Sequence, residues 1–232
     1  MKLITTQKDP TEIDELLGDA KAIFLAGCGT CATLCKTGGV AEVLAIKERL
    51  ENEGRKVTGW TVIPIACDDL SREALQENAK AVNGAEAILV MACAFGVQTV
   101  AECADKPALP ALNTMFVGKE GGFGFYSEVC AQCGDCVIGK TAGICPITQC
   151  AKGLLNGPCG GTNRGKCEVD SSVDCAWTLI YRRLEELGRL DSMEEILPPK
   201  NYAKTSAPRR ADLSDLIAAE LGGRADEEMV VR

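Results

Sequence analysis

The sequence predicts an α/β protein in which an open parallel sheet with flanking helices precedes a small cysteine-rich domain and C-terminal helices. Two observations point to this fold class. Before residue 120, short apolar runs alternate with segments of helical periodicity, as in parallel sheets whose connections are helices. From Phe123 to Cys175, glycine and cysteine dominate and no periodicity survives, so this stretch has little apolar core of its own.

The first domain, predicted over residues 1–120, begins with a helix capped at Thr11 and then alternates strands with helices. An apolar run that ends at Gly27 is typical of a buried strand, and helical spacing follows over residues 40–50. A β-rich segment is expected next over residues 56–65, followed by a capped helix over 71–82 and a strand over 87–91. A helix over residues 97–104 and a fourth strand over 111–117 complete the domain. Such alternation predicts parallel strands, whose carboxyl ends meet at one edge of the sheet.

The second domain is predicted over residues 121–202, where an amphipathic helix follows the cysteine-rich stretch. This helix extends from Ala176 to Leu187 and is stopped by a glycine. Residues 203–232 form a tail in which one more helical segment is expected between Ala211 and Leu221. The chain gives that segment little to pack on, so it is a candidate docking helix for a partner.

Composition argues against several classes of function. The net charge is −8 and no basic stripe stands out, so no nucleic-acid partner is expected. Since no run of about 20 apolar residues is present, no membrane insertion is expected either. The first ten residues, MKLITTQKDP, lack the apolar core of a signal peptide, and we expect a cytoplasmic protein.

The chain has fourteen cysteines and no histidine. In a cytosolic protein, many cysteines indicate metal or redox ligands rather than disulfides. The lack of histidine excludes His-ligated metals, His-ligated haem and a His general base. A soft-metal site must then be all-thiolate or nearly so, which points to iron–sulfur clusters or to zinc held by four cysteines.

Cysteines follow the carboxyl ends of three predicted strands. The stretch GCGTCATLCKTGG places Cys28, Cys31 and Cys35 after the first strand, and Cys67 and Cys93 follow the second and third. Because these strand ends meet at one edge of the sheet, four of the five thiolates are expected to hold one cluster there. Zinc is one alternative. A thioredoxin-like pair, Cys28 and Cys31, is another, although a dithiol leaves the remaining cysteines unexplained.

A second group of cysteines occupies the stretch CAQCGDCVIGKTAGICP. Cys130, Cys133 and Cys136 have two residues between neighbours, and Cys145 precedes a proline, as in bacterial ferredoxins. The last gap is eight residues instead of three, so the match is partial and Cys145 need not join its neighbours. A cluster is the favoured interpretation and a four-cysteine zinc knuckle is the alternative.

Four more cysteines lie in glycine-rich surroundings further along, at Cys150, Cys159, Cys167 and Cys175. Either they furnish a separate site, or this domain has one site with structural thiols beside it. Glycines next to a cluster let backbone N–H groups approach the sulfurs. The whole chain is therefore expected to hold two or three [4Fe–4S] clusters, with zinc as the alternative at one site.

These cysteine-rich stretches resemble a known family. The segments CAQCGDC, GICPITQCAKGLLNGPCGG, GKCEV, CAWTLIYRRLEELGRLD and LPPKN are similar to the C-terminal domain of methylenetetrahydrofolate reductase. With GCGTCATLCKTGG, IACDD, ILVMACAFGVQTVAE and PALNTMFVG, they resemble the small, MetV-like subunit of the two-subunit methylenetetrahydrofolate reductases of acetogenic and related bacteria. The resemblance covers roughly residues 15–202.

The resemblance implies an accessory subunit of an oxidoreductase whose chemistry takes place on a partner. That partner would be a flavin-bearing TIM-barrel subunit that reduces methylenetetrahydrofolate to methyltetrahydrofolate, in the methyl branch of one-carbon fixation (the Wood–Ljungdahl pathway). This chain, too short for the barrel itself, would pass electrons to the flavin from ferredoxin or a larger redox complex. The alternative is a zinc-binding scaffold subunit of the same reductase with no redox role.

Overall fold

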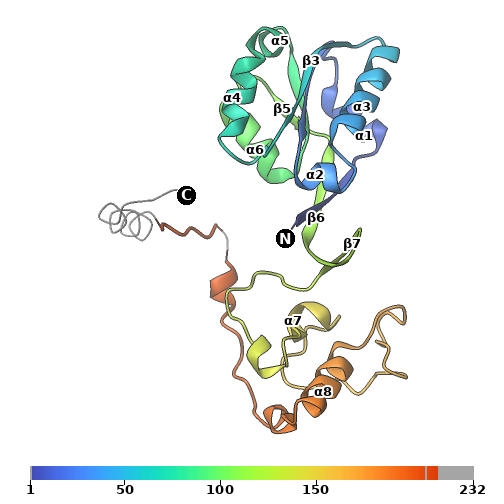
Figure 1. Ribbon diagram of the computed structural model, residues 1–232, viewed down its shortest axis with the longest axis vertical. Helices are drawn as coiled ribbons and strands as arrows, with labels where there is room; N and C mark the ends of the chain where they lie inside the picture. Colours follow the sequence, from blue (N-terminus) through green and yellow to red (C-terminus); the bar gives the residue numbers. More distant parts are fainter. Residues whose placement is uncertain (1, 207, 214–232) are drawn as a thin grey trace, which may run out of the picture. The chain divides into compact units, whose positions relative to one another are not determined.

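The computed structural model describes residues 2–206 and 208–213, which fall into two units (Figure 1). The first unit ends at Val129 and the second begins at Cys130. The first unit continues beyond residue 120 because strands β6 (Leu112–Gly122) and β7 (Phe125–Glu128) belong to a sheet with β1 (Lys2–Gln7). The helical segment predicted between Ala211 and Leu221 lies largely outside the described residues.

The first unit has the predicted α/β fold, built on a four-stranded parallel sheet of order β3-β2-β4-β5. The strands are β2 (Ala22–Cys28), β3 (Lys56–Ile63), β4 (Ala87–Met91) and β5 (Ala108–Pro110). The two central strands, β2 and β4, are apolar and buried along almost their whole length. Such sequences suit strands that are covered on both faces, where no side chain reaches water.

Helices cover both faces of this sheet (Figure 1). On one face lie α1 (Pro10–Leu17) and α3 (Val40–Asn52); on the other lie α4 (Leu70–Glu77), α5 (Ala79–Asn83) and α6 (Ala94–Cys103). The first helix starts one residue before the predicted cap, because Asp9 is its N-cap and accepts a hydrogen bond from the Thr11 N–H at 2.9 Å.

The helix predicted over residues 71–82 is divided in two at Asn78. This residue ends α4 and precedes α5, and its side-chain amide donates to the Ala74 carbonyl at 2.9 Å. An asparagine side chain that bonds to the backbone competes with helical hydrogen bonds, so the chain turns here.

The segment predicted as a fourth strand over residues 111–117 is a strand, β6, but it does not join the parallel sheet. It pairs antiparallel with β1 and β7 in a separate three-stranded sheet of order β1-β6-β7. The fourth place in the parallel sheet is taken by the short β5, which pairs with β4. The sequence therefore predicted the strand correctly and its sheet wrongly.

The described part of the second unit has few regular elements. They are the 3₁₀ turns η1 (Ile138–Lys140), η2 (Leu190–Met193) and η3 (Tyr202–Thr205), the short helix α7 (Pro146–Gln149) and the helix α8 (Ala176–Glu186). Trp177, Ile180 and Leu184, on one face of α8, are buried, and partly buried side chains of the surrounding loops pack against them. The Trp177 indole N–H donates to the Leu154 carbonyl at 3.0 Å, which attaches the cysteine-rich loop to the helix. In the part of the chain that is described, no helix is long and apolar enough to cross a membrane.

Candidate metal centres

Four thiols of the first unit gather beyond the carboxyl ends of the parallel strands. Cys28 ends β2, Cys31 opens the short helix α2 (Cys31–Leu34), Cys67 follows β3 and Cys93 precedes α6. The pKa of the Cys67 thiol is raised, first because neighbouring atoms partly remove it from water and then by the charges of Cys93, Cys28 and Cys31. The Cys67 sulfur is thus close enough to the other three to be affected by their charges.

Cys35 lies apart from this group. It ends α2, and its thiol donates to the Leu3 carbonyl at 3.7 Å. The Leu3 N–H in turn donates to the Cys31 sulfur at 3.5 Å, so α2 is attached to β1 through two cysteines. Of the five cysteines predicted to share a site in this unit, the structure brings together Cys28, Cys31, Cys67 and Cys93, and it directs Cys35 to the backbone of β1.

Close backbone packing holds the Cys67 turn against α6. A Cβ at Gly96 would lie 2.9 Å from the Cβ of Ala66 and 2.8 Å from that of Ala92, so only glycine lets α6 approach the turn this closely. The buried Ser71 hydroxyl donates to the Ala66 carbonyl at 2.8 Å from the other side. Cys67 and Cys93 are therefore brought together by the backbone around them.

In the second unit, the cysteines at 150, 159, 167 and 175 line one pocket together with Lys152 and Glu168. The Cys159 thiol donates to Glu168 at 3.3 Å, and Glu168 forms an ion pair with Lys152. The Gly161 N–H donates to the Cys159 sulfur at 3.4 Å. These four cysteines thus share the lining of one pocket, and whether they form a separate site stays a prediction.

Hydrogen bonds around the Cys175 sulfur favour its thiolate form. It is the N-cap of the eleven-residue helix α8. Burial opposes ionisation, but hydrogen bonds from the side chain and backbone of Thr178, from the Thr162 hydroxyl and from the Trp177 N–H lower the pKa of Cys175 overall. Donors of this kind favour the anionic sulfur that a soft metal requires.

The remaining group, Cys130, Cys133, Cys136 and Cys145, lies in the loop before α7 and at its start. The Thr148 hydroxyl accepts from the Ala131 N–H at 3.0 Å and from the Cys145 thiol at 3.7 Å, so it joins the two ends of this group. The Gln132 N–H donates to the Cys130 sulfur at 3.4 Å. Cys136 is exposed in the same loop.

Lys200 is a member of this last site that was not predicted from the sequence. The pKa of Cys133 is lowered, first by a hydrogen bond with the Asp135 backbone and, against the effect of burial, by a hydrogen bond and a charge from Lys200. The only sequence signal was the stretch LPPKN, which places a lysine directly after two prolines. A lysine 67 positions from its cysteine gives no spacing pattern that could be recognised.

The donor set fits a soft metal or an iron–sulfur group. All fourteen cysteines are free thiols, and backbone N–H groups point at the sulfurs of Cys31, Cys130 and Cys159. The fourteenth, Cys103, ends α6 and packs on the core of the first unit. Within the described residues, no three Cys, Asp or Glu side chains lie close enough together to hold a single metal ion.

Residues 109–203 match the family described as "Methylene-tetrahydrofolate reductase C terminal". No curated protein and no solved structure matches the chain significantly. The matched segment runs from β5 to η3 and includes both cysteine groups of the second unit. This chain therefore carries a domain of the methylenetetrahydrofolate reductase C-terminal type.

Proposed function

We propose that this chain, with its reductase-type C-terminal domain, is the electron-transfer subunit of a methylenetetrahydrofolate reductase. In this proposal the cysteine groups hold iron–sulfur clusters, and electrons pass through them to the flavin of a catalytic partner. The observation that carries the proposal is the gathering of Cys28, Cys31, Cys67 and Cys93 at one edge of the sheet. A cluster requires four thiols such as these, which come from three separate segments, whereas a simple dithiol requires only two.

An iron–sulfur cluster, when bound, supplies one-electron transfer at a potential set by its protein surroundings. The chain's own contribution is to hold the thiolates and to place N–H and O–H donors on them, as at Cys175. Reduction of methylenetetrahydrofolate consumes two electrons and two protons, so a flavin on the partner would collect electrons that arrive singly.

The surroundings of the Cys67 turn support contact with a partner. Cys67 is exposed, and the large apolar side chains of Leu34, Ile65 and Phe95 are exposed within three residues of Cys31, Cys67 and Cys93, respectively. Exposed apolar side chains around a site are typical of protein–protein interfaces. A partner that covered this surface would bring its redox group near the four thiols.

Metal analysis of the protein purified without oxygen tests the proposal. We expect about four irons and four acid-labile sulfides for each cluster, with negligible zinc and the brown colour of the iron–sulfur chromophore. Stoichiometric zinc with negligible sulfide would instead establish the zinc-binding scaffold. A Cys103→Ser variant is the matched control, since Cys103 packs on the apolar core and its loss should leave the iron content unchanged.

The relay itself is tested by the rate of flavin reduction. A flavin-bearing reductase subunit is mixed with reduced ferredoxin in the presence and absence of this chain, and flavin absorbance is followed. The proposal requires that the loaded chain accelerate the reduction and that a Cys67→Ser variant do so less. Equal rates with and without the chain would rule out the relay even if iron and sulfide were present.

A further inference from the structure

Lys200 is a buried lysine, which is unusual because a charged group loses its hydration when it is buried without a partner. Its side chain is 3% exposed. The ammonium group donates a hydrogen bond to the Asp135 backbone carbonyl and lies 3.8 Å from the Asp135 carboxylate. The Cys133 thiol donates to the same carbonyl at 3.7 Å. Sulfur and ammonium therefore share one acceptor and lie side by side.

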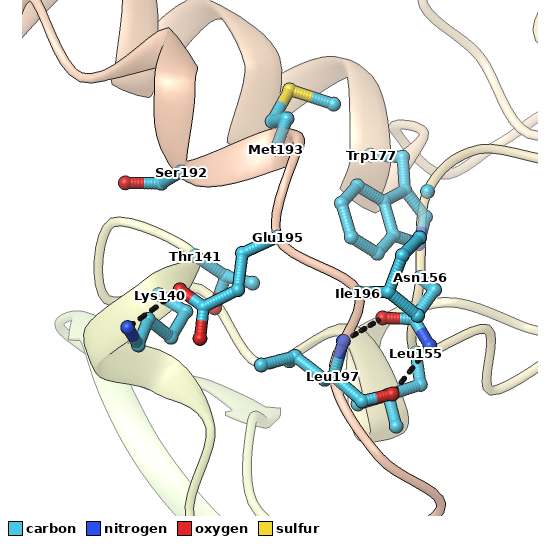
Figure 2. A pocket seen from close by; sticks show the side chains of 11 residues that line it. Lys140, Thr141, Leu155, Asn156, Trp177, Ser192, Met193, Glu195, Ile196 and Leu197 are labelled. Carbon is cyan, nitrogen blue, oxygen red and sulfur yellow. Dashed lines mark hydrogen bonds and ion pairs between the residues drawn. The ribbon is translucent and has the colours of Figure 1, made fainter.

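The segment that carries Lys200 is fixed before it reaches the cysteine loop (Figure 2). The Asn156 side chain accepts from the Leu197 N–H and donates to the Leu197 carbonyl, both at 2.9 Å, in the manner of a strand pair. Glu195 pairs with Lys140 at 2.7 Å. Pro198 and Pro199 then restrict the backbone up to Lys200. Lys200 therefore directly follows a segment whose position is held by Asn156 and Lys140.

The charge of Lys200 is not cancelled by Asp135. The Asp135 carboxylate lies closer to Lys204, at 3.0 Å, than to Lys200, at 3.8 Å. Arg209 adds another cation, since its guanidinium donates to the Gln132 carbonyl at 2.7 Å. In the described residues, Asp135 thus pairs with two lysines, and Arg209 binds the backbone of the same CAQCGDC loop.

We propose that Lys200 raises the reduction potential of the cluster ligated by Cys133. This inference rests on the proposed function, because it requires that the loop hold an iron–sulfur cluster. Reduction adds one electron from the donor and therefore one negative charge, with no bond made or broken. A positive charge beside a ligating sulfur stabilises the reduced form more than the oxidised form, and more strongly where water is excluded. Lys200 thus acts through Cys133 as a positioning residue.

The test compares Lys200→Gln with Lys204→Gln in the full chain purified without oxygen. Glutamine removes the charge and keeps an N–H donor, on a side chain that is one carbon shorter. Lys204 is the matched control, because it pairs with the same aspartate but has a side chain that is 48% exposed. Midpoint potentials are measured by redox titration with EPR detection, and the signal of this centre is the one lost in Cys133→Ser.

We expect Lys200→Gln to shift this midpoint potential to a more negative value at unchanged iron and sulfide content. Lys204→Gln should shift the midpoint potential less. Lys200→Arg, which keeps the positive charge, should have the midpoint potential of the wild type. An unchanged midpoint in iron-loaded Lys200→Gln overturns the inference and leaves the proposed function intact, and so does an equal shift in Lys204→Gln. Loss of the cluster in Lys200→Gln assigns the lysine a structural role and overturns the inference as well. Wild-type protein without sulfide or EPR signal overturns both proposals.

Discussion

The cysteines of this chain differ in what surrounds each sulfur. Cys175 is surrounded by donors that favour its anion, whereas the pKa of Cys67 is raised by partial burial and by three neighbouring thiols. Cys67 therefore holds its proton more tightly until a cation or cluster offsets the repulsion. Metal binding at this edge of the sheet should accordingly release protons and weaken as the pH falls.

The geometry of the first unit predicts different effects for two cysteine substitutions. Cys67→Ser should remove one of four converging thiols and abolish the iron and sulfide of this centre. Cys35→Ser should leave both unchanged, because its sulfur bonds to the Leu3 carbonyl at 3.7 Å. Iron and sulfide per chain are measured for both variants and for the wild type. Equal losses in the two variants would show that Cys35 is a ligand.

At the scale of the element, the site depends on how closely α6 approaches the turn after β3. Gly96→Ala should force apart α6 and Ala66, because its Cβ would lie 2.9 Å from the Ala66 Cβ. Overpacking of this kind costs about 1–3 kcal/mol of unfolding free energy, and iron content should fall as Cys67 and Cys93 separate. Urea denaturation and iron analysis measure the two effects.

The matched control is Gly84→Ala. Gly84 ends α5 with φ −76°, and a Cβ there would meet nothing nearer than 3.4 Å. This variant should retain the stability and iron content of the wild type. If Gly96→Ala behaved in the same way, close packing of α6 on the turn would not be what positions the two thiols.

The succession of elements in the first unit could be predicted from the sequence, since buried strands such as Ala87–Met91 consist of uninterrupted apolar residues. The three-stranded sheet of β1, β6 and β7 could not be predicted from the sequence. β1 has only one buried residue, Thr5, and pairs with a strand more than a hundred residues away. The approach of Cys67 to Cys28, Cys31 and Cys93 could be expected from topology alone. The position of Lys200 beside Cys133 could not, because it depends on how an irregular segment returns to the cysteine loop.

At the scale of the whole molecule, the two units differ in how their folds are supported. The core of the first unit combines residues from a sheet and helices on both faces. In the described part of the second unit, three side chains of α8 are fully buried, and partly buried side chains of the surrounding loops pack against them. This smaller core buries less apolar surface. The second unit should therefore draw much of its folding free energy from whatever its eight cysteines bind.

Removal of metal should unfold the second unit and spare the first. With metal-free protein under reducing conditions, we expect backbone amides of α8 around Ile180 to lose protection against hydrogen exchange. Amides of the central strands around Leu25 and Leu89 should keep theirs. The measurement is hydrogen exchange of the loaded and the metal-free chain, with amide protection compared for each peptide. Protection of α8 that survived metal removal would show that the second unit folds by its own packing.

The pairing of β1 with β6 has a consequence for how the protein is made. Lys2 lies opposite Gly118, and Leu3 contacts the sulfurs of both Cys31 and Cys35. On the ribosome, Cys28, Cys31, Cys67 and Cys93 all emerge before β6, the strand that gives β1 its place over α2. The Cys31 sulfur can therefore receive its hydrogen bond from the Leu3 N–H only after β6 has been synthesised, whereas Cys67 is exposed even in the complete fold.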